Sequence, residues 1–263
     1  MDSERLYVDL LFKASRKYAS WDPEVEVNVG DWGRITSGRR GLAFWRKQRG
    51  TFLKEGNIYT DGIAEEYGIP SPKEHGKDAT EGVTWITSQN TQEIDVSAGA
   101  GSQTPVLAQC SVKAGFKFSS SQSSAVLAMD NDTISTIDPP GSLRRLLDDA
   151  RMRDSVIVSE VHRCSSYARY LSSPHTGNVF IGLSAEPPVP GIASVEAHAK
   201  WVRSTVTGNF KSRVNKPGDR QFCPLFRLVS LKETDTAVGL RGSWDGEIPP
   251  LPDAEPPWMT EAP

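Results

Sequence analysis

The sequence predicts an α+β fold: a twisted antiparallel sheet with two long, extensible β-hairpins and a few flanking helices. Segments that alternate polar and apolar residues come in pairs, joined by links too short for the helical crossovers of a parallel sheet. Helical periodicity is limited to the start of the chain, a short helix-like piece within residues 61–78 and a stretch after residue 140. The 263 residues have an ordinary composition and a net charge of −3, which excludes a coiled coil, a mostly disordered chain and a strongly basic nucleic-acid arm.

The first element is an amphipathic helix predicted over residues 3–18. Its apolar side holds Leu6, Tyr7, Leu10, Leu11, Ala14 and Tyr18. Its adjoining side holds the cations Arg5, Lys13, Arg16 and Lys17, with Asp9 placed to pair with Lys13 one turn later. Two interpretations fit this pattern: a helix docked on the core with a solvated basic face, or a helix that lies on a membrane surface.

A basic and aromatic segment follows at residues 34–54. It has seven Lys and Arg residues and no acid, and the apolar run Leu42–Trp45 interrupts the charges. The cations nearest this run are Arg39, Arg40, Arg46, Lys47 and Arg49. Such residues suit an anionic lipid surface, with Phe44 and Trp45 as interfacial anchors. Alternatively, the two rings pack inward and the charges keep a hairpin soluble.

The first predicted hairpin is centred on a serine-rich tip. Its outgoing arm, Cys110–Phe118, alternates between two faces, and Ala125–Met129 returns after the tip Ser119–Ser124. The apolar face of the outgoing arm includes Val112, Phe116 and Phe118, and its polar face includes Lys113. An additional strand is predicted at Val83–Thr87.

The second half of the chain predicts a helix, two buried strands and another hairpin. A helix follows the break Asp138–Ser142, and the strands are Val156–Val161 and Leu225–Leu231. The return arm of the second hairpin has an apolar face made of Ala193, Val195, Ala197, Ala199 and Trp201. Proline-containing breaks at Ser172–Pro174 and Pro187–Pro190 interrupt its ladder, because proline lacks the N–H donor.

Both hairpins allow two interpretations. Their alternating arms have the roughly 9 to 11 residues of a transmembrane β-strand, with lysines on the polar face. Any antiparallel sheet with one solvated face alternates in the same way. Four such strands cannot close a pore alone, so insertion requires a self-oligomer that pairs every strand edge.

Motifs for catalysis, cofactors and metals are not found in the sequence. It has no phosphate-binding loop, dinucleotide fingerprint, zinc-protease motif or nucleophile elbow, so we expect no enzyme activity, no cofactor and no metal. Cys110, Cys164 and Cys223 share no metal or redox spacing, and the start of the chain lacks a signal peptide. These features favour the cytoplasm.

Charge divides the chain into a basic body and an acidic end. Residues 233–263 carry seven acids against Arg241 and are rich in proline. We interpret residues 1–232 as one domain and residues 233–263 as a tail without a folded inhibitory domain. The tail, with Trp244 and Trp258 as anchors, is a candidate cover for the basic body.

The stretch GRITSGRRGLAFWRKQRGTFLKEGNIYTD resembles the first strands of the gasdermin pore-forming domain. VIVSEV with its hairpin, the closing CPLFRLVSL and the serine-rich tip after VKAGFKF resemble later parts of that domain. The resemblance is architectural and covers residues 1–232, and the short fungal gasdermins that regulate cell death in non-self recognition (heterokaryon incompatibility) are the most similar branch.

The resemblance implies a function. Gasdermins bind acidic phospholipids such as cardiolipin, phosphoinositides and phosphatidylserine through the first helix and the following loop, here the nine cations named above with Phe44 and Trp45. They move from the cytoplasm to the plasma membrane, oligomerise and insert two hairpins, here about residues 92–137 and 163–214, which causes lytic cell death. The trigger would be an allelic variant chain or an activating protease. The alternative is a lipid- or protein-binding β-rich module that never inserts.

Overall fold

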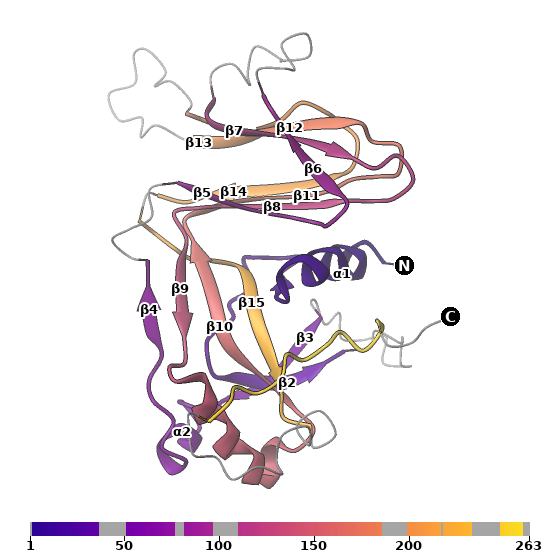
Figure 1. Ribbon diagram of the computed structural model, residues 1–263. Coiled ribbons are helices and arrows are strands. Elements are labelled where there is room, and N and C mark those ends of the chain that lie inside the picture. The colour runs from indigo at the N-terminus through magenta and orange to yellow at the C-terminus, as the bar shows by residue number, and fades with distance from the viewer. Residues whose placement is uncertain are drawn as a thin grey trace, which may run out of the picture.

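The computed structural model describes residues 2–36, 51–76, 82–96, 110–185, 199–216, 218–232 and 248–259. The described strands form three sheets in which every pairing is antiparallel, and the helices are few and mostly short. The predicted α+β class with antiparallel strands is therefore confirmed. Two of the sheets stack as a sandwich at one end of the molecule, and the third forms the other end (Figure 1).

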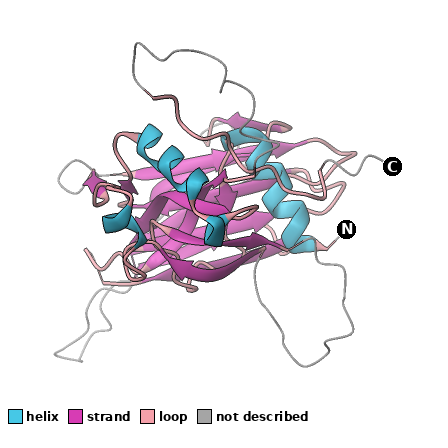
Figure 2. Cartoon of the chain, turned by 90° about the horizontal axis from the view of Figure 1, so that it is seen from below, coloured by secondary structure: helices cyan, strands magenta, loops and turns pink. Residues whose placement is uncertain are grey.

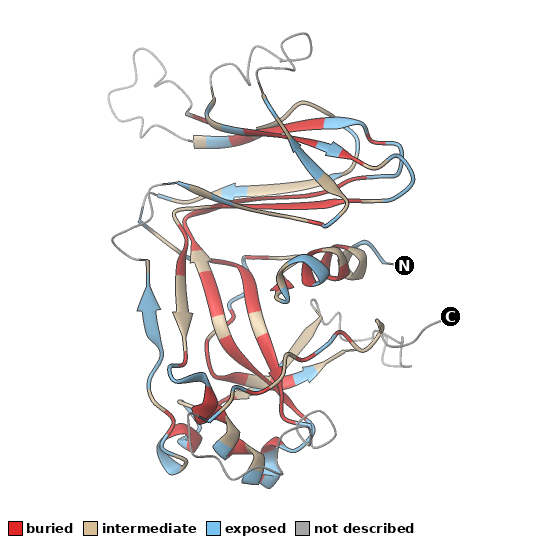
Figure 3. Cartoon of the chain, viewed as in Figure 1, coloured by how far each residue is buried: buried red, intermediate tan, exposed pale blue. Residues whose placement is uncertain are grey.

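The main sheet has the strand order β1-β15-β10-β2-β3, and β9 and β4 extend it from β10. Its strands are β1 (Tyr18–Ala19), β2 (Asp31–Ile35), β3 (Phe52–Asn57), β4 (Lys73–His75), β9 (Thr133–Thr136), β10 (Val156–Cys164) and β15 (Phe222–Ser230). The apolar runs of β10 and β15 fit their central position, and both strands are buried along most of their length (Figure 3).

The sandwich consists of a base sheet, β14-β11-β8-β5, and an outer sheet, β13-β12-β7-β6. The base strands are β5 (Val83–Thr87), β8 (Ala125–Asp130), β11 (Ser166–Leu171) and β14 (Asn209–Val214). The outer strands are β6 (Thr91–Ile94), β7 (Cys110–Phe118), β12 (Asn178–Ala185) and β13 (Ala199–Arg203). Apolar side chains from both sheets form one buried cluster between them.

Two long hairpins, each folded in half, build this sandwich. In the first, β5 pairs with β8 and β6 pairs with β7, so the arm β5–β6 runs against the arm β7–β8. In the second, β11 pairs with β14 and β12 pairs with β13. Both hairpins fold back at matching points along their arms, which is why the two sheets have corresponding strand orders.

The predicted pairing of the first hairpin is wrong, although both of its strands exist. β7 and β8 belong to different sheets, and the serine-rich stretch 119–124 is the bend between them rather than a hairpin tip. The reason is the burial of β8 on both faces: Val126 and Ala128 face the sandwich core, whereas Leu127 and Met129 belong to the cluster that includes helix α1. Alternation specifies which face is buried but not which strand is the partner.

The helices are α1 (Ser3–Ser15), α2 (Ile63–Glu66) and the 3₁₀ helices η2 (Pro140–Asp148) and η3 (Ala150–Met152). α2 lies at the far end of the main sheet (Figure 1), and the helices lie in front of the strands when the molecule is seen from below (Figure 2). α1 is shorter than the predicted 3–18, because Arg16 adopts a left-handed conformation (φ 60°) and Tyr18 enters β1. Ala14, predicted on the apolar side, is exposed.

The strand β2 starts one residue after a glycine turn. Gly30 has a φ of 86°, which favours glycine, whereas Gly33 lies inside β2, although the glycines at 30–33 and 38–41 had suggested two turns. At a bulge between Trp32 and Gly33, a Cβ on Gly33 would lie 1.9 Å from the backbone oxygen of Leu53. The second of these turns, at Gly38–Gly41, lies outside the described residues.

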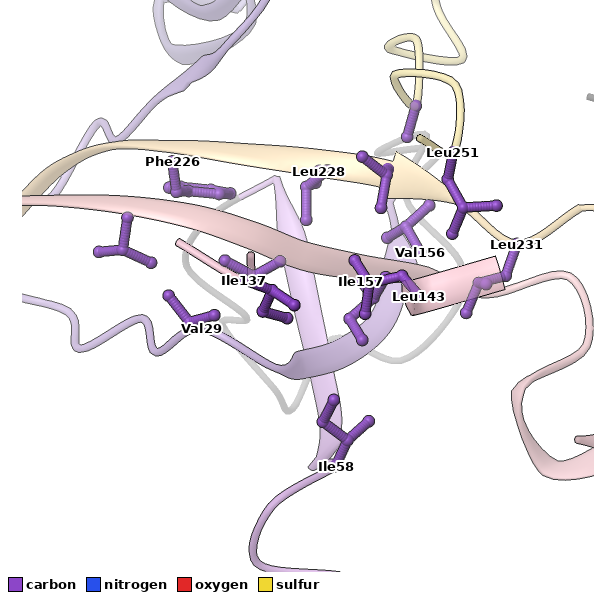
Figure 4. Packing of buried hydrophobic residues seen from close by; sticks show 14 of the residues in the cluster. Val29, Ile58, Ile137, Leu143, Val156, Ile157, Phe226, Leu228, Leu231 and Leu251 are labelled. Atoms are coloured by element: carbon purple, nitrogen blue, oxygen red, sulfur yellow. The ribbon is translucent and has the colours of Figure 1, made fainter. Parts of the chain in front are cut away.

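The largest core cluster joins the main sheet to the 3₁₀ helix η2 and to residues near the end of the chain. Figure 4 shows Val156, Ile157, Leu143, Leu231 and Leu251 among its members. Full burial of such a side chain contributes about 1.5–3 kcal/mol. This part of the acidic tail is therefore a component of the core.

Candidate functional site

Helix α1 is wedged between the sandwich and the main sheet (Figure 1). Its buried Tyr7 and Leu11 join the cluster beneath the base sheet, and Val8 and Phe12 join the main-sheet core. The backbone N–H of Arg16 donates to the oxygen of Phe12 (2.8 Å) and ends the helix. α1 is therefore docked on the core, as one of the two sequence interpretations expected.

Two of the cations on α1 contact the C-terminal segment, which we define as residues 248–259. The guanidinium of Arg16 donates to Glu255 (3.0 Å) and lies 3.6 Å from Asp253. The guanidinium of Arg5 lies over the indole of Trp258, 5.1 Å from the ring centroid. Both cations belong to the predicted lipid-binding set.

The C-terminal segment runs along the part of β15 that β1 leaves unpaired. The N–H of Ala254 donates to the oxygen of Leu228 (2.9 Å), and the N–H of Ser230 donates to the oxygen of Pro252 (2.9 Å). The segment thus makes a short antiparallel bridge at the edge of the main sheet, where Asp253 pairs with Val229.

Side chains fix the segment as well. Leu251 and Ala254 are buried, and the hydroxyl of Tyr18 donates to the oxygen of Ala254 (2.8 Å). The guanidinium of Arg227 donates to Asp253 (2.6 Å). The segment is therefore held by apolar burial, backbone pairing and charge together.

A buried carboxylate on α1 anchors the end of the segment. The indole N–H of Trp258 donates to Asp9, which the sequence had paired with Lys13. Burial raises the pKa of Asp9, while the hydrogen bond from Trp258 opposes that rise. Lys13 is exposed and makes no ion pair within the described part of the chain.

A cavity of about 570 Å³ lies between the segment and the body. Arg16, Arg34 and Lys232 line it from the body, and Asp253 and Glu255 line it from the segment. Opposite charges thus face each other across an incompletely packed interface.

Lys17 is engaged in a buried polar network at the bend where β10 passes into β11. Its amino group pairs with Glu160 and lies 2.8 Å from His162 Nε2, and His162 Nδ1 lies 3.2 Å from Asp132. Burial opposes ionisation of Glu160, but hydrogen bonds from His162 and Lys17 outweigh it and lower its pKa to about 2. Cys164, two residues from His162, is buried, and burial raises the pKa of its thiol, which disfavours a nucleophilic thiolate.

The predicted membrane-hairpin residues that are described point as their alternation predicts. Phe116, Phe118 and Trp201 are buried in the sandwich core, and Val112 and Ala199 pack against its edge. Lys113 lies on the exposed face of the outer sheet. Val195 and Ala197 lie outside the described residues.

The basic and aromatic loop also lies outside the described residues, so the structure places none of its predicted lipid contacts: Arg39, Arg40, Phe44, Trp45, Arg46, Lys47 and Arg49. The strands that lead to it are described. Ile35 pairs with Phe52, and the N–H of Thr36 donates to the oxygen of Thr51 (2.9 Å). The loop therefore connects the ends of a closed β2–β3 hairpin.

The sequence indicated that Trp258 anchors the acidic tail. It did not indicate that Tyr18, Arg227 and Arg16 of the body also hold the C-terminal segment. The alternation of Asp253 and Glu255 about the apolar Ala254 was a signal for a short strand. The body residues carried no comparable signal, because their roles depend on long-range pairing.

No cluster of three or more potential metal ligands occurs within the described ranges. Among the same residues, no helix is long and apolar enough to cross a membrane. The sequence matches no protein-family model and no curated protein.

Proposed function

We propose that this chain is a gasdermin-like pore-forming protein that binds acidic phospholipids, oligomerises and inserts its two hairpins into the plasma membrane. Lytic cell death in fungal non-self recognition is the biological outcome that the sequence resemblance suggests. The observation that carries the proposal is that both hairpins are folded in half at matching positions, one beside the other. Such hairpins lengthen by unbending, with no exchange of strand partners.

Unbending provides a lipid-compatible surface. When the hairpins straighten, the two inner faces of the sandwich lie end to end on one side of a single four-stranded sheet. That side carries the apolar cluster of Phe116, Tyr170, Ile181 and their neighbours. The outer sheet presents Lys113 and Lys200 on its opposite side, which suits a water-filled lumen.

Arm length and edge pairing are consistent with insertion. The described arms, for example Ser166–Ala185 along β11 and β12, exceed the roughly 9 to 11 residues that cross a bilayer. The opened sheet would have unpaired edges at β5–β6 and at β13–β14. A ring of identical chains satisfies those edges, because each chain pairs with the next.

The C-terminal segment and the membrane would compete for the cations of α1, and the chain would rest in the cytoplasm while the segment is docked. The C-terminal segment contacts Arg5 and Arg16, two of the cations that would otherwise contact lipid headgroups. Displacement of the segment, by proteolysis or by a partner chain, removes its contacts with both. Each cation near an anionic surface contributes about 1 kcal/mol.

The test measures binding and leakage separately. Vesicles containing phosphatidylserine, cardiolipin or phosphoinositides are sedimented with the protein, and release of a trapped dye is recorded in parallel. Binding with dye release, and ring-shaped particles on the vesicles, supports the proposal. For the loop, joint charge reversal of Arg46, Lys47 and Arg49 is expected to abolish sedimentation, whereas unchanged binding removes that loop from the site.

A second candidate function is a lipid- or protein-binding module that never inserts. The tight closure of the sandwich favours it: the indole N–H of Trp201 in the outer sheet donates to the hydroxyl of Ser166 in the base sheet (2.9 Å), and both residues are buried. Vesicle binding without dye release, after removal of the C-terminal segment, favours this module over the pore.

A further inference from the structure

A second cavity, separate from the C-terminal segment, lies beneath the start of α1. It has a volume of about 350 Å³, within the size range of small-molecule pockets. One wall is apolar and is formed by Trp21, Val25, Val27, Phe52 and Phe226. Two basic side chains, Arg169 and Lys211, also line it, together with two acidic ones, Glu4 and Asp22.

Arg169 is the unusual member of this lining. Only 4% of the residue is exposed, and its guanidinium lies 3.6 Å from the ring centroid of Trp21. Nη1 donates to the side-chain oxygen of Asn209 (3.1 Å), whereas Nε is buried without a partner. Arg169 makes no ion pair within the described part of the chain. A buried guanidinium without a carboxylate partner is costly for a fold.

The nearby carboxylates of Asp22 and Glu4 attract this guanidinium, but neither forms an ion pair with it in the described part of the chain. Lys211, directly opposite Arg169 on β14, pairs with Asp22 (2.5 Å) and Glu24 (3.4 Å). Glu4 lines the cavity but does not pair with Arg169. Burial, followed by the charge of Asp2, raises the pKa of Glu4, while the charge of Arg169 opposes that rise.

We propose that this cavity binds an amphipathic anion, with its carboxylate or phosphate head at Arg169 and its apolar body against Phe52 and Phe226. The planar guanidinium recognises both kinds of head by paired hydrogen bonds, and its remaining donors are unused. Val25, 48% exposed, stands at the mouth of the cavity. This inference does not rest on the proposed pore function.

A purely structural role for Arg169 makes a different prediction. If the arginine only supports the fold through Trp21 and Asn209, its loss harms stability and no ligand is involved. Replacement of a buried charge by an apolar side chain of similar volume is often neutral or stabilising. Arg169→Met is therefore expected to fold and to lose the anion site.

The experiment is calorimetric titration of the full chain with sodium decanoate and with decyl phosphate, each below its micellar concentration, in the absence of membranes. We expect one ligand per chain for at least one of the two. Decanol, which has the same chain without the charge, is expected to bind at least about tenfold more weakly. The head that binds identifies the chemistry as carboxylate or phosphate.

Three variants make the test specific. Arg169→Met is expected to weaken anion binding at least about tenfold. Val25→Trp fills the mouth of the cavity without touching the buried charge and is expected to abolish binding. This variant keeps the test valid if Arg169→Met does not fold. Arg213→Met is the matched control, since Arg213 lies on the neighbouring strand, pairs with Glu24 and does not line the cavity.

A final titration separates the sources of the anion. Vesicles containing phosphatidic acid that displace decanoate identify a membrane lipid as the ligand, whereas failure to displace it identifies a soluble amphiphile. Either result supports the site. Absence of binding by both anions at millimolar concentration overturns the proposal, as does binding by Arg169→Met and Val25→Trp that is as tight as that of the unchanged chain. Since membranes are absent from the main titration, its failure is distinct from failure of pore formation.

Discussion

At the scale of single residues, His162 connects the two ends of the molecule. It sits on β10 next to the bend into β11, 3.2 Å from Asp132 and 2.9 Å from Glu160. Asp132 also accepts from Thr84 of the base sheet (2.8 Å), and Glu160 pairs with Lys17 just after α1. An imidazolium satisfies both carboxylates at once, because each ring nitrogen then carries a proton.

We expect this network to make stability depend on pH. Burial and the charge of Lys17, whose amino group lies 2.8 Å from Nε2, lower the pKa of His162, but hydrogen bonds to Asp132 and Glu160 outweigh them and raise the pKa above its ordinary value. The stabilisation is therefore fully present below about pH 6.5 and is lost as pH rises through the raised pKa. Urea unfolding at a series of pH values measures the decline, and His162→Gln is expected to remove it. An equal decline in the variant would contradict this account.

A single hydroxyl tests how the C-terminal segment is held. Tyr18→Phe removes the hydrogen bond to the oxygen of Ala254 and is expected to loosen residues 248–259 by about 1 kcal/mol, seen as faster amide hydrogen exchange there. Tyr59→Phe is the matched control, because Tyr59 donates to the oxygen of Pro70 (2.8 Å), in another part of the chain. Similar exchange in both variants would show that the hydroxyl of Tyr18 does not hold the segment.

At the scale of elements, the sequence located most strands but not their partners. Cys110–Phe118 and Val83–Thr87 coincide with β7 and β5, because alternation records which face is buried. The pairing of β7 with β6 and β12 depends on contacts distant in sequence. The apolar run Ala125–Met129 held a clue, since a strand without polar positions is covered on both faces and is unsuited to a two-stranded hairpin with one solvated face.

The sequence likewise indicated some residues of the candidate site but not their partners. The cations of α1 follow from helical periodicity, but their partners come from the far end of the chain. Arg169 was not singled out, because an arginine on a strand is ordinarily exposed and the cover provided by Trp21 arises only in the folded chain.

The closure of the sandwich gives a prediction at this scale. Ser166→Ala leaves the buried indole N–H of Trp201 without its acceptor and is expected to cost about 1–3 kcal/mol of unfolding free energy, measured by urea denaturation. Ser111→Ala is the control, because Ser111 is exposed and its hydroxyl bonds only within the outer sheet, to the oxygen of Leu183 (3.2 Å). Equal costs in the two variants would mean that the contact between the sheets is unimportant. In the pore account, Ser166→Ala also accelerates dye release.

At the scale of the whole molecule, the net charge of −3 combines a basic body with an acidic end, and part of that end is docked on the body. Screening by salt weakens attraction between exposed charges. If the chain binds acidic membranes as proposed, the attraction is expected to depend on whether the segment is in place and on ionic strength.

We expect a chain that ends at Lys232 to bind phosphatidylserine vesicles more tightly than the full chain, by about 1 kcal/mol for each cation that no longer contacts the segment. Vesicle sedimentation measures the difference, which should shrink at high salt. Arg5→Gln with Arg16→Gln in the shortened chain is expected to reverse the gain. Circular dichroism confirms folding, since the truncation also removes the buried Leu251 and Ala254. Unchanged affinity of a folded shortened chain would exclude the segment as a cover.

The central claim is that the folded hairpins open and enter the bilayer, and neighbouring positions on β13 test it most directly. Ala199 packs against the sandwich core and Lys200 is exposed on the other face. A fluorophore is attached at Ala199→Cys or at Lys200→Cys, with Cys110→Ser to remove the partly accessible native thiol. On leaking vesicles that carry a quencher in the lipid chains, the account predicts quenching at position 199 and none at 200. Equal signals at the two positions, or no quenching at either, would contradict it.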